Sequence, residues 1–394
     1  MTEIRDIEYL VGSKKIRNKT ITPYNNIICN FLSDLSKELN LSEESKVYPD
    51  IKTLAFWCRK KNIEKFKNQF KSNESRLGLG LLFHITPSNI PTNFAYSLVF
   101  GLVTGNSNVI KVPSQNFEQV KIICNTINKI LKKYKTLQDM ITIVRYKNHN
   151  FFTNKFSLLC SARLIWGGDN TIKEIQKYSS DQRSIDITFS DRYSFCTINS
   201  EKFLSLKKDG IKTLAEKFYN DTYLVDQNGC SSPHLVVWIG KKYKKARVKF
   251  WSSLKEVVEK KYELSESASF DKYTQLFKDI LSLKNISNYE MYGSQIYTVL
   301  LKKLDKDNHK LRGKWGFFYE YNTNDINKIK SFINPRYQTL TYFGLEKNTL
   351  SKFVLSNKLR GIDRVVPIGQ ALDMNFFWDG YDINKILTRV VEIR

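Results

Sequence analysis

The sequence predicts an α/β fold with two parts, a doubly wound domain followed by a second α/β domain. Two observations lead to this prediction. From about residue 76, short apolar runs alternate with amphipathic helical segments, an order typical of a parallel sheet with helices on both faces. Near residue 200 the alternation starts again, and the length of 394 residues suits two domains better than one.

The elements of the first domain follow one another closely. Helical patterns at 24–39 and 52–70 precede it. The apolar run Leu77–Ile85 predicts a buried strand, and Thr92 or Asn93 can cap a helix that ends near Gly105. The next expected elements are a strand at 107–113, a helix at 118–134, strands at 139–146 and 162–168, a helix at 171–180, and closing strands at 185–189 and 193–199.

The second domain repeats the alternation. A helix at 203–219 leads into the loop DQNGC, and a strand at 235–239 follows. The remaining expected elements are helices at 246–262 and 270–283, strands at 297–304 and 316–322, a helix at 325–333, a strand at 339–344, a helix at 350–357 and a strand at 363–369. Doubly wound sheets bind ligands at the carboxyl ends of their strands, so polar residues at such ends are candidates for function.

Charge and hydropathy argue against two classes of function, nucleic-acid binding and membrane insertion. The net charge is +24, from 63 Lys and Arg against 39 Asp and Glu, which suits a nucleic acid or a polyphosphorylated ligand. The basic residues are spread along the chain without a helix-turn-helix, RNP or zinc-finger signature, so we expect no nucleic-acid partner. The longest apolar run, at 94–105, has 12 residues. A bilayer requires roughly 20, so no membrane span is expected.

The cysteines and the start of the chain indicate a cellular setting. MTEIRDIEYL lacks the apolar core of a signal peptide, and the six cysteines are scattered without metal-binding spacing. We therefore expect a cytoplasmic protein with reduced thiols and no metal site. Five of the six cysteines are interpreted as small apolar side chains.

Cys230 is the candidate nucleophile. It follows a flexible Asn228–Gly229 pair at the entrance to a strand, where a thiolate can be approached and backbone N–H groups can face a developing oxyanion. A lone loop cysteine is more often structural. Asn89, in a turn after the first strand, could donate to the same oxyanion, although Asn more often stabilises such a turn.

Other candidates lie at the ends of two further strands. Lys111 and Ser114 follow the second strand, where the ribose or a phosphate of a dinucleotide would lie, but a solvated Lys is an equally good interpretation. Gly167 and Gly168 precede a helix, and such a turn lets a phosphate approach helix N–H groups. Because no GxGxxG accompanies them, the two glycines alone are a weak signal.

Six segments in order carry a resemblance: HITPSNIPTNF, GNSNVIKVPSQN, WGGDNTI, DITFSDRYSF, DQNGCSSPH and GIDRVVPIGQALDMNFFWDGYD. Together they resemble the aldehyde dehydrogenase superfamily and, within it, the LuxC-type acyl-CoA reductases, the fatty acid reductase component that supplies aldehyde in bacterial bioluminescence. The segments extend from about Leu77 to Asp382. DQNGCSSPH and the stretch from RVVPIG to WDGYD are the most specific.

The resemblance implies an aldehyde-dehydrogenase-like fold, a doubly wound Rossmann-type cofactor domain with a second α/β catalytic domain. Residues 1–198 would contain the N-terminal segment and the NADP-binding domain, 199–357 the catalytic domain, and 358–394 a segment that returns to the active-site and cofactor region.

It also implies roles for the candidates. Cys230 matches the family's nucleophile, and Asn89 its oxyanion-hole amide. Lys111 and Ser114 match the cofactor-binding position, and the turn Gly167–Gly168 matches the loop on the phosphate side.

The implied reaction is the NADPH-dependent reduction of an acyl thioester, an acyl-CoA or an acyl-enzyme, to the aldehyde through an acyl-Cys230 intermediate. An acyl-protein synthetase partner and a homo-oligomer, dimer or tetramer, are expected on the same ground. Two alternatives stay open: a donor on an acyl carrier protein or delivered by a synthetase and, in a different class, a basic nucleic-acid-binding protein without catalysis. NADPH against NADH also stays open.

The chain departs from the superfamily in two places. Hydrolytic members carry a Glu that activates water against the thioester, whereas DITFSDRYS places Thr188 or a neighbour there, which favours reduction over hydrolysis. The glycine turn lacks the superfamily's second glycine. His234 is interpreted as structural, and Arg364 could contact a ligand phosphate or pair with Asp363 or Asp373.

Overall fold

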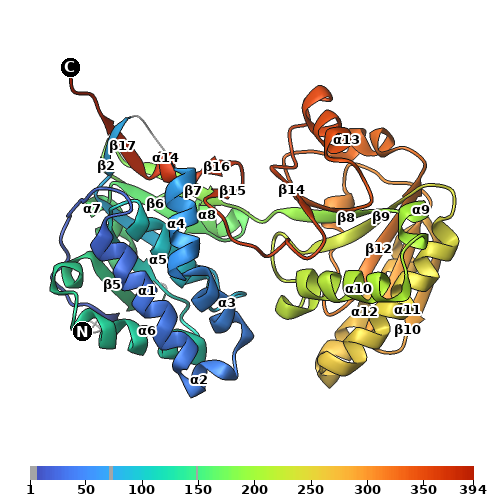
Figure 1. Cartoon of the computed structure of the whole chain (residues 1–394), viewed down its shortest axis with the longest axis horizontal. Helices are drawn as coiled ribbons and strands as arrows, with labels where there is room; N and C mark the ends of the chain where they lie inside the picture. Colours follow the sequence, from blue (N-terminus) through green and yellow to red (C-terminus); the bar gives the residue numbers. More distant parts are fainter. Residues whose placement is uncertain (1–6, 71–73, 148–149) are drawn as a thin grey trace. The chain divides into compact units, whose positions relative to one another are not determined.

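The computed structural model describes residues 7–70, 74–147 and 150–394. Its contacts form two compact units (Figure 1), unit 1 with residues 1–191 and 374–394 and unit 2 with residues 192–373. The chain therefore enters unit 2 once and returns to unit 1 for its last residues. The sequence analysis placed these divisions after residues 198 and 357.

A six-stranded sheet forms the centre of unit 1 in the described ranges. Its strands in spatial order are β1 (Glu8–Val11), β5 (Ile141–Arg145), β4 (Ser107–Lys111), β3 (Leu81–Ile85), β6 (Ala162–Trp166) and β7 (Ile185–Phe189). Only the β1–β5 pair is antiparallel in this sheet. The chain moves outward from β3 in both directions, so the order reverses between β3 and β6, where doubly wound sheets bind ligands. The predicted parallel sheet is confirmed.

Helices cover both faces of this sheet. The helices of unit 1 in the described ranges are α1 (Asn26–Leu41), α2 (Glu43–Lys46), α3 (Pro49–Trp57), α4 (Lys60–Gln69), α5 (Asn93–Val103), α6 (Glu118–Leu131), η1 (Lys135–Met140), α7 (Asn150–Leu159), α8 (Asp169–Gln176) and α14 (Ile383–Ile386). Of these, α1 packs on other helices, among them α5 and α6. One face of the sheet packs against α5 and α6. On the other, Phe156 of α7 and Ile172 of α8 share a core with Phe83. The helix predicted at 52–70 is two helices, α3 and α4.

Two short antiparallel pairs complete unit 1. They are β2 (Ser75–Gly78) with β17 (Thr388–Val391), and β15 (Phe377–Trp378) with β16 (Tyr381–Asp382). The run predicted as one strand at Leu77–Ile85 is thus divided between two sheets, because Gly80 at φ 139° turns the chain between β2 and β3. The returning segment is anchored in the core, where the Trp57 indole N–H donates to Met374 O at 2.9 Å.

Unit 2, in which every residue is described, contains a seven-stranded sheet. Its strands in spatial order are β10 (Ile286–Tyr292), β11 (Ile296–Leu301), β12 (Phe317–Thr323), β9 (Pro233–Ile239), β8 (Tyr193–Asn199), β13 (Tyr337–Phe343) and β14 (Arg364–Pro367). The prediction that residues 193–199 close the first sheet is wrong. Cys196 and Phe195 enter cores on opposite faces of the second sheet, so β8 needs cover on both sides, and unit 2 provides it.

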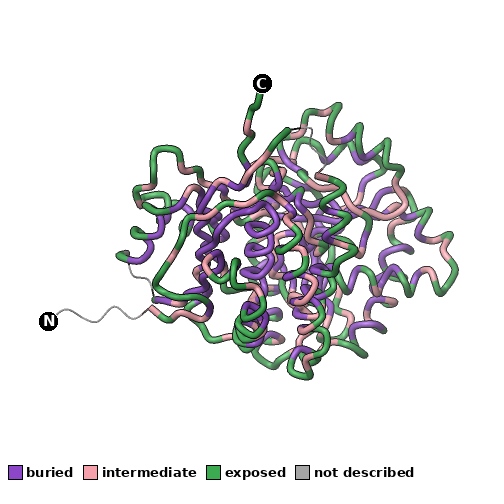
Figure 2. The backbone as a smooth tube through the Cα atoms, turned by 60° about the vertical axis from the view of Figure 1, so that its left-hand side comes forward, coloured by how far each residue is buried: buried purple, intermediate pink, exposed green. Residues whose placement is uncertain are grey.

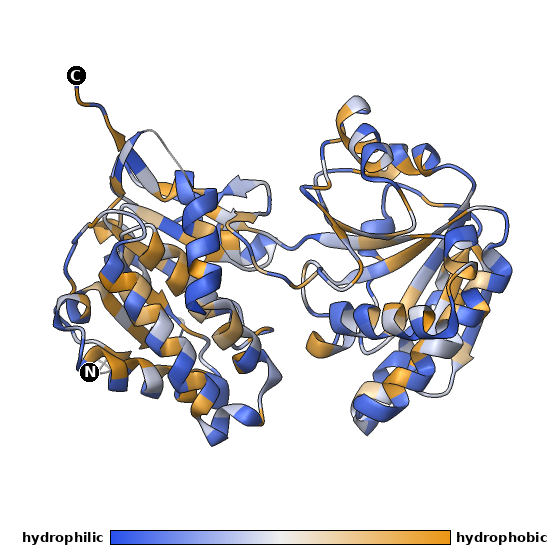
Figure 3. Cartoon of the chain, viewed as in Figure 1, coloured by the Kyte–Doolittle hydropathy of each residue, from blue (hydrophilic) through white to orange (hydrophobic). Residues whose placement is uncertain are grey.

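That cover consists of helices on each face (Figure 1). They are α9 (Ser200–Leu204), α10 (Lys208–Thr222), η2 (Tyr223–Val225), α11 (Tyr243–Lys261), α12 (Glu266–Ser282), η3 (Asn308–Lys310), η4 (Ile326–Phe332), α13 (Lys347–Ser351) and η5 (Lys352–Ser356). The first face packs against α9, α10 and α11, and the second against α12, η4, α13 and η5. The inner strands β3, β6, β9 and β11 are buried along their whole length. Figure 2 marks buried, intermediate and exposed residues along the backbone, and Figure 3 shows the apolar character of the sheet strands. In the parts of the chain with described coordinates, no helix has the length and apolar character needed to cross a membrane.

Candidate functional site

The carboxyl edge of the unit 1 sheet collects the positions predicted to hold a cofactor. The register pairs Ile85 with Lys111 on one side and with Ile165 on the other. The turn that carries Asn89 and the turn at Gly167 therefore leave the same edge, on either side of the place where the strand order reverses. The cofactor positions and Asn89, which was predicted to donate to the oxyanion, therefore lie along one edge of the sheet.

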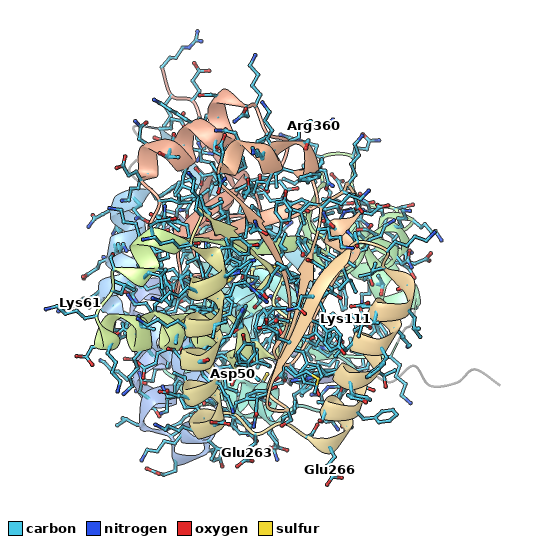
Figure 4. The ribbon with its side chains drawn as sticks, turned by 90° about the vertical axis from the view of Figure 1, so that its right-hand side faces the viewer. Asp50, Lys61, Lys111, Glu263, Glu266 and Arg360 are labelled. Atoms are coloured by element: carbon cyan, nitrogen blue, oxygen red, sulfur yellow. The ribbon has the colours of Figure 1, made fainter. Side chains whose placement is uncertain are left out.

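Lys111 is fixed at the end of β4. Its carbonyl oxygen accepts hydrogen bonds from the backbone N–H and the hydroxyl of Thr86, at 3.2 and 2.8 Å. Its ammonium, labelled in Figure 4, lies 5.0 Å from the ring centroid of Tyr146, and burial lowers the Lys111 pKa. Ser114 donates to Tyr146 O at 3.3 Å. Tyr146 thus links the two predicted cofactor positions.

The turns that follow β3 and β6 each carry candidate residues. Asn89 is exposed in its turn. A Cβ on Gly167 would lie 3.1 Å from the Thr171 side chain, whereas one on Gly168 would meet nothing within 4 Å. Asp169 follows in the first turn of α8, and its carboxylate would repel a phosphate there. The glycine turn is therefore a less favourable phosphate site than the sequence alone suggests.

A buried polar chain supports this edge from inside, and the sequence analysis missed it. The Trp166 indole N–H donates to Ser97 Oγ at 3.0 Å, and Ser97 Oγ lies 2.7 Å from His84 Nδ1. His84 Nε2 lies 3.0 Å from Asn108 Oδ1, an acceptor, so Nε2 carries the proton and Nδ1 accepts from Ser97. Burial lowers the His84 pKa to about 3, which keeps the ring neutral.

Cys230 lies in unit 2, in a turn between η2 and β9, and is half-buried. Its carbonyl oxygen accepts a hydrogen bond from Ser194 Oγ at 2.7 Å, and the same Oγ accepts from Thr339 N–H at 3.1 Å. The turn is closed by Ser232 N–H, which donates to Gly229 O at 3.0 Å. These bonds fix the Cys230 backbone against the starts of β8 and β13.

Gln227 fixes the chain that enters this turn. Asp226 and Gln227 both have left-handed backbones, at φ 51° and 58°, which is costly for residues other than glycine. The buried Gln227 amide offsets this cost. Its Oε1 accepts from the N–H groups of Gly316 and Phe317 at 2.7 and 3.1 Å, and its Nε2 donates to two carbonyl oxygens. In the sequence, this turn is marked by the run DQNGC.

His234 and Arg364 have structural partners. Buried His234 faces Gly313 O through Nδ1 at 3.0 Å and stacks on Tyr193, and burial lowers its pKa to about 3. A neutral ring held in this way agrees with its interpretation as structural. Arg364 donates to backbone carbonyls rather than pairing with Asp363, whose carboxylate Oδ2 lies 2.5 Å from Arg192.

The structure places the candidates in two groups. Asn89, Lys111, Ser114 and the Gly167–Gly168 turn belong to unit 1, and Cys230 belongs to unit 2. Within the described ranges, no group of three or more His, Cys, Asp or Glu side chains is arranged to hold a metal ion.

The family profile of acyl-CoA reductase (LuxC) matches residues 55–390. The chain belongs to this family. The match includes every candidate residue in both units, and it includes Thr188, the position on β7 at which hydrolytic aldehyde dehydrogenases were expected to have a Glu.

A curated relative of the family is the long-chain acyl-protein thioester reductase of Vibrio harveyi, 21% identical over 320 residues. The match covers 79% of this chain and 63% of that protein, so the chain spans less than two thirds of its relative.

Solved aldehyde dehydrogenases share the fold. Lactaldehyde dehydrogenase from Escherichia coli matches with a TM-score of 0.62 at 11% identity, covering 92% of this chain and 86% of that one. An aldehyde dehydrogenase from Burkholderia cenocepacia, described as putative, matches with a TM-score of 0.64 at 12% identity, covering 93% and 86%. The aldehyde-dehydrogenase-like fold expected from the sequence is confirmed.

Proposed function

We propose that this protein reduces an activated acyl group to the aldehyde with NADPH, through a thioester on Cys230. The observation that carries the proposal is the Cys230 turn, which lies within the matched family segment and is held by Ser194 and Gln227 while the cysteine itself stays half-buried. A nucleophile must be accessible and must not move, and this turn meets both requirements.

The chemistry assigned to this chain begins at the sulfur. The Cys230 thiolate attacks the acyl carbonyl carbon, and the donor's own thiolate leaves, so that one thioester replaces another. The carbonyl oxygen becomes an oxyanion that backbone N–H groups of the turn and the Asn89 amide would hold. When bound, the cofactor supplies a hydride to the acyl carbon. The thiohemiacetal anion then expels the Cys230 thiolate and releases the aldehyde.

Thiolate expulsion needs no strong general acid, which agrees with a threonine at position 188. Without a carboxylate there to activate water, the acyl-Cys230 thioester would persist until a hydride reaches it. Hydrolysis to the free acid should therefore be slow.

The carboxyl edge of the unit 1 sheet fits a nicotinamide dinucleotide. The reversal between β3 and β6 is the usual place for one, and the Lys111 ammonium supplies a positive charge beside it. Lys111 and Ser114 would hold the ribose and phosphate side. We assign NADPH rather than NADH on this charge.

The donor is an acyl-CoA or an acyl-protein, the two kinds that the family description and the relative's name mention. An acyl-protein synthetase partner, a dimer or tetramer, and a cytoplasmic location belong to the same proposal.

Intact-mass measurement of the full chain tests the proposal. We expect acyl-CoA, added without NADPH, to increase the mass by one acyl group in wild type and not in Cys230→Ala. NADPH should then discharge the adduct and yield aldehyde. Cys196→Ala is the matched control, because Cys196 is fully buried in the core.

The two donor classes give different outcomes. An adduct formed only from an acyl-protein would exclude acyl-CoA as donor and keep the mechanism. If no activated acyl donor labels Cys230, the proposed mechanism is wrong.

A further inference from the structure

A second turn of unit 2 lies against the Cys230 turn. It contains residues 369–373, the last residues of unit 2 before the chain returns to unit 1, and is called the exit turn below. A Cβ placed on Gly229 would lie 3.2 Å from Leu372 Cδ2 and 3.1 Å from Ser232 Oγ. Gly229 therefore lets Leu372 pack directly on the residue that precedes Cys230.

Two opposite charges hold the exit turn. The Arg364 guanidinium donates to the carbonyl oxygens of Gln370, Ala371 and Asp373 at 2.8, 2.6 and 2.7 Å. The buried Asp221 carboxylate accepts from the N–H groups of Gly369 and Ala371 at 2.6 and 2.8 Å. Five hydrogen bonds to charged groups fix the conformation of this five-residue turn, since each is stronger than a bond between neutral groups.

One of these two charges, Arg364, also acts on the nucleophile. Arg364 interacts electrostatically with Asp373, Asp221 and Cys230, and it is the cation of this group. Asp221 is the group's buried carboxyl, and burial raises its pKa to about 7 against the opposing effect of its two N–H donors, so it is mainly ionised only above that pH. A positive charge close to a thiol favours the thiolate.

We infer that Arg364 is a positioning residue for Cys230. It shapes the exit turn on which the Cys230 turn rests, with Asp221 as its counterpart, and its charge favours the Cys230 thiolate. This inference rests on the proposed role of Cys230 as nucleophile, and it gives a role to an arginine that the sequence left between a ligand contact and an ion pair.

Alkylation of Cys230 by iodoacetamide tests the inference without any acyl donor or cofactor. The rate is followed by intact mass between pH 6 and 9 on the full chain. In Arg364→Met we expect alkylation to slow about tenfold at neutral pH and its half-maximal rate to move to higher pH, because the thiolate loses its neighbouring cation. Arg364→Lys should restore part of the pH shift, since it keeps the charge.

Two further variants separate positioning from folding. Arg360→Met is the matched control, because Arg360 is exposed (Figure 4). In this variant Cys230 should be alkylated at the wild-type rate. Leu372→Ala keeps both charges and removes only the side chain that packs at Gly229. It should slow alkylation without moving its pH dependence, at an unchanged circular dichroism spectrum.

Distinct results would overturn each part. An unchanged pH dependence in folded Arg364→Met would show that the Arg364 charge does not favour the Cys230 thiolate. A wild-type alkylation rate in Leu372→Ala would show that the exit turn does not position Cys230. If Arg364→Met does not fold, Arg364→Gln, which removes the charge but keeps a hydrogen-bond donor, and Leu372→Ala still decide both parts. Failure of the acyl reductase proposal would appear differently, as normal alkylation of Cys230 with no acyl adduct.

Discussion

The Ser194 hydroxyl donates a 2.7 Å hydrogen bond to the carbonyl oxygen of Cys230, from the second residue of β8. Because that oxygen then points at Ser194, the peptide plane after Cys230 has one orientation. The hydroxyl is itself oriented by Thr339 N–H, which donates to it. The cysteine is thus tied to two neighbouring strands of the sheet through one side chain.

Removing this side chain should affect both stability and acylation. Ser194→Ala leaves Thr339 N–H and Cys230 O in a buried place without this partner, and we expect a loss of about 1–3 kcal/mol in the free energy of unfolding. We also expect slower acyl-Cys230 formation, measured by intact mass in single-turnover experiments. Ser205→Ala is the matched control, because Ser205 makes an exposed local bond to Lys202 O. Equal acylation rates in both variants would show that Ser194 does not position Cys230.

Gln227→Glu tests the entry to the same turn with almost no change in volume. The carboxylate would keep the two bonds accepted from Gly316 and Phe317, and it would replace the Nε2 donor with an acceptor facing Pro233 O. Leaving this buried oxygen unpaired should cost about 1–3 kcal/mol in urea unfolding and slow Cys230 alkylation. Gln138→Glu, which changes one part-buried bond in unit 1, is the control. Unaltered alkylation would show that the left-handed pair is held by the backbone alone.

The sequence predicted the elements well and their pairing less well. Apolar runs identify strands, so β4, β6 and β9 were found close to their bounds, but a run does not show which sheet receives it. β8 was therefore assigned to the wrong sheet. Likewise, β2 and β3 were predicted as one strand, because Gly80, where the chain turns, does not interrupt the apolar run in the sequence.

The candidate site shows the same limit. Cys230 and the strand-end positions stand in recognisable local motifs, so they could be named from the sequence. The residues that hold them could not. Ser194 is 36 residues from Cys230, and Asp221 is 150 from Ala371, so their hydrogen bonds follow from the tertiary fold alone.

Lys111→Met tests the assignment of the cofactor edge. If the ammonium beside Tyr146 contacts the 2′-phosphate, its loss should raise the KM for NADPH at least tenfold and change that for NADH less. Formation of acyl-Cys230, which precedes the cofactor step, should keep its wild-type rate. Lys61→Met is the control, since Lys61 is exposed on α4 (Figure 4). An equal increase in the KM for NADPH and for NADH would show that Lys111 does not select the 2′-phosphate.

Two buried histidines should make the free energy of unfolding depend on pH. His84 and His234 have folded pKa values of about 3, and each should titrate near 6.5 when unfolded. Between these values the unfolded chain binds more protons than the folded one. Their contribution to stability is therefore fully present above about pH 6.5 and decreases as the pH falls toward 3.

His84→Gln should isolate one of the two contributions. At pH 7.5 the variant should be less stable than wild type by about 1–3 kcal/mol, because its amide cannot satisfy both Ser97 and Asn108 as the ring does. At pH 5 this difference should shrink by about 2 kcal/mol, since wild type now also has to keep a histidine neutral and the variant does not. Urea unfolding at the two pH values measures both differences. His309→Gln, outside the core, is the control. A difference that stays constant with pH would show that His84 is not held neutral in the folded protein.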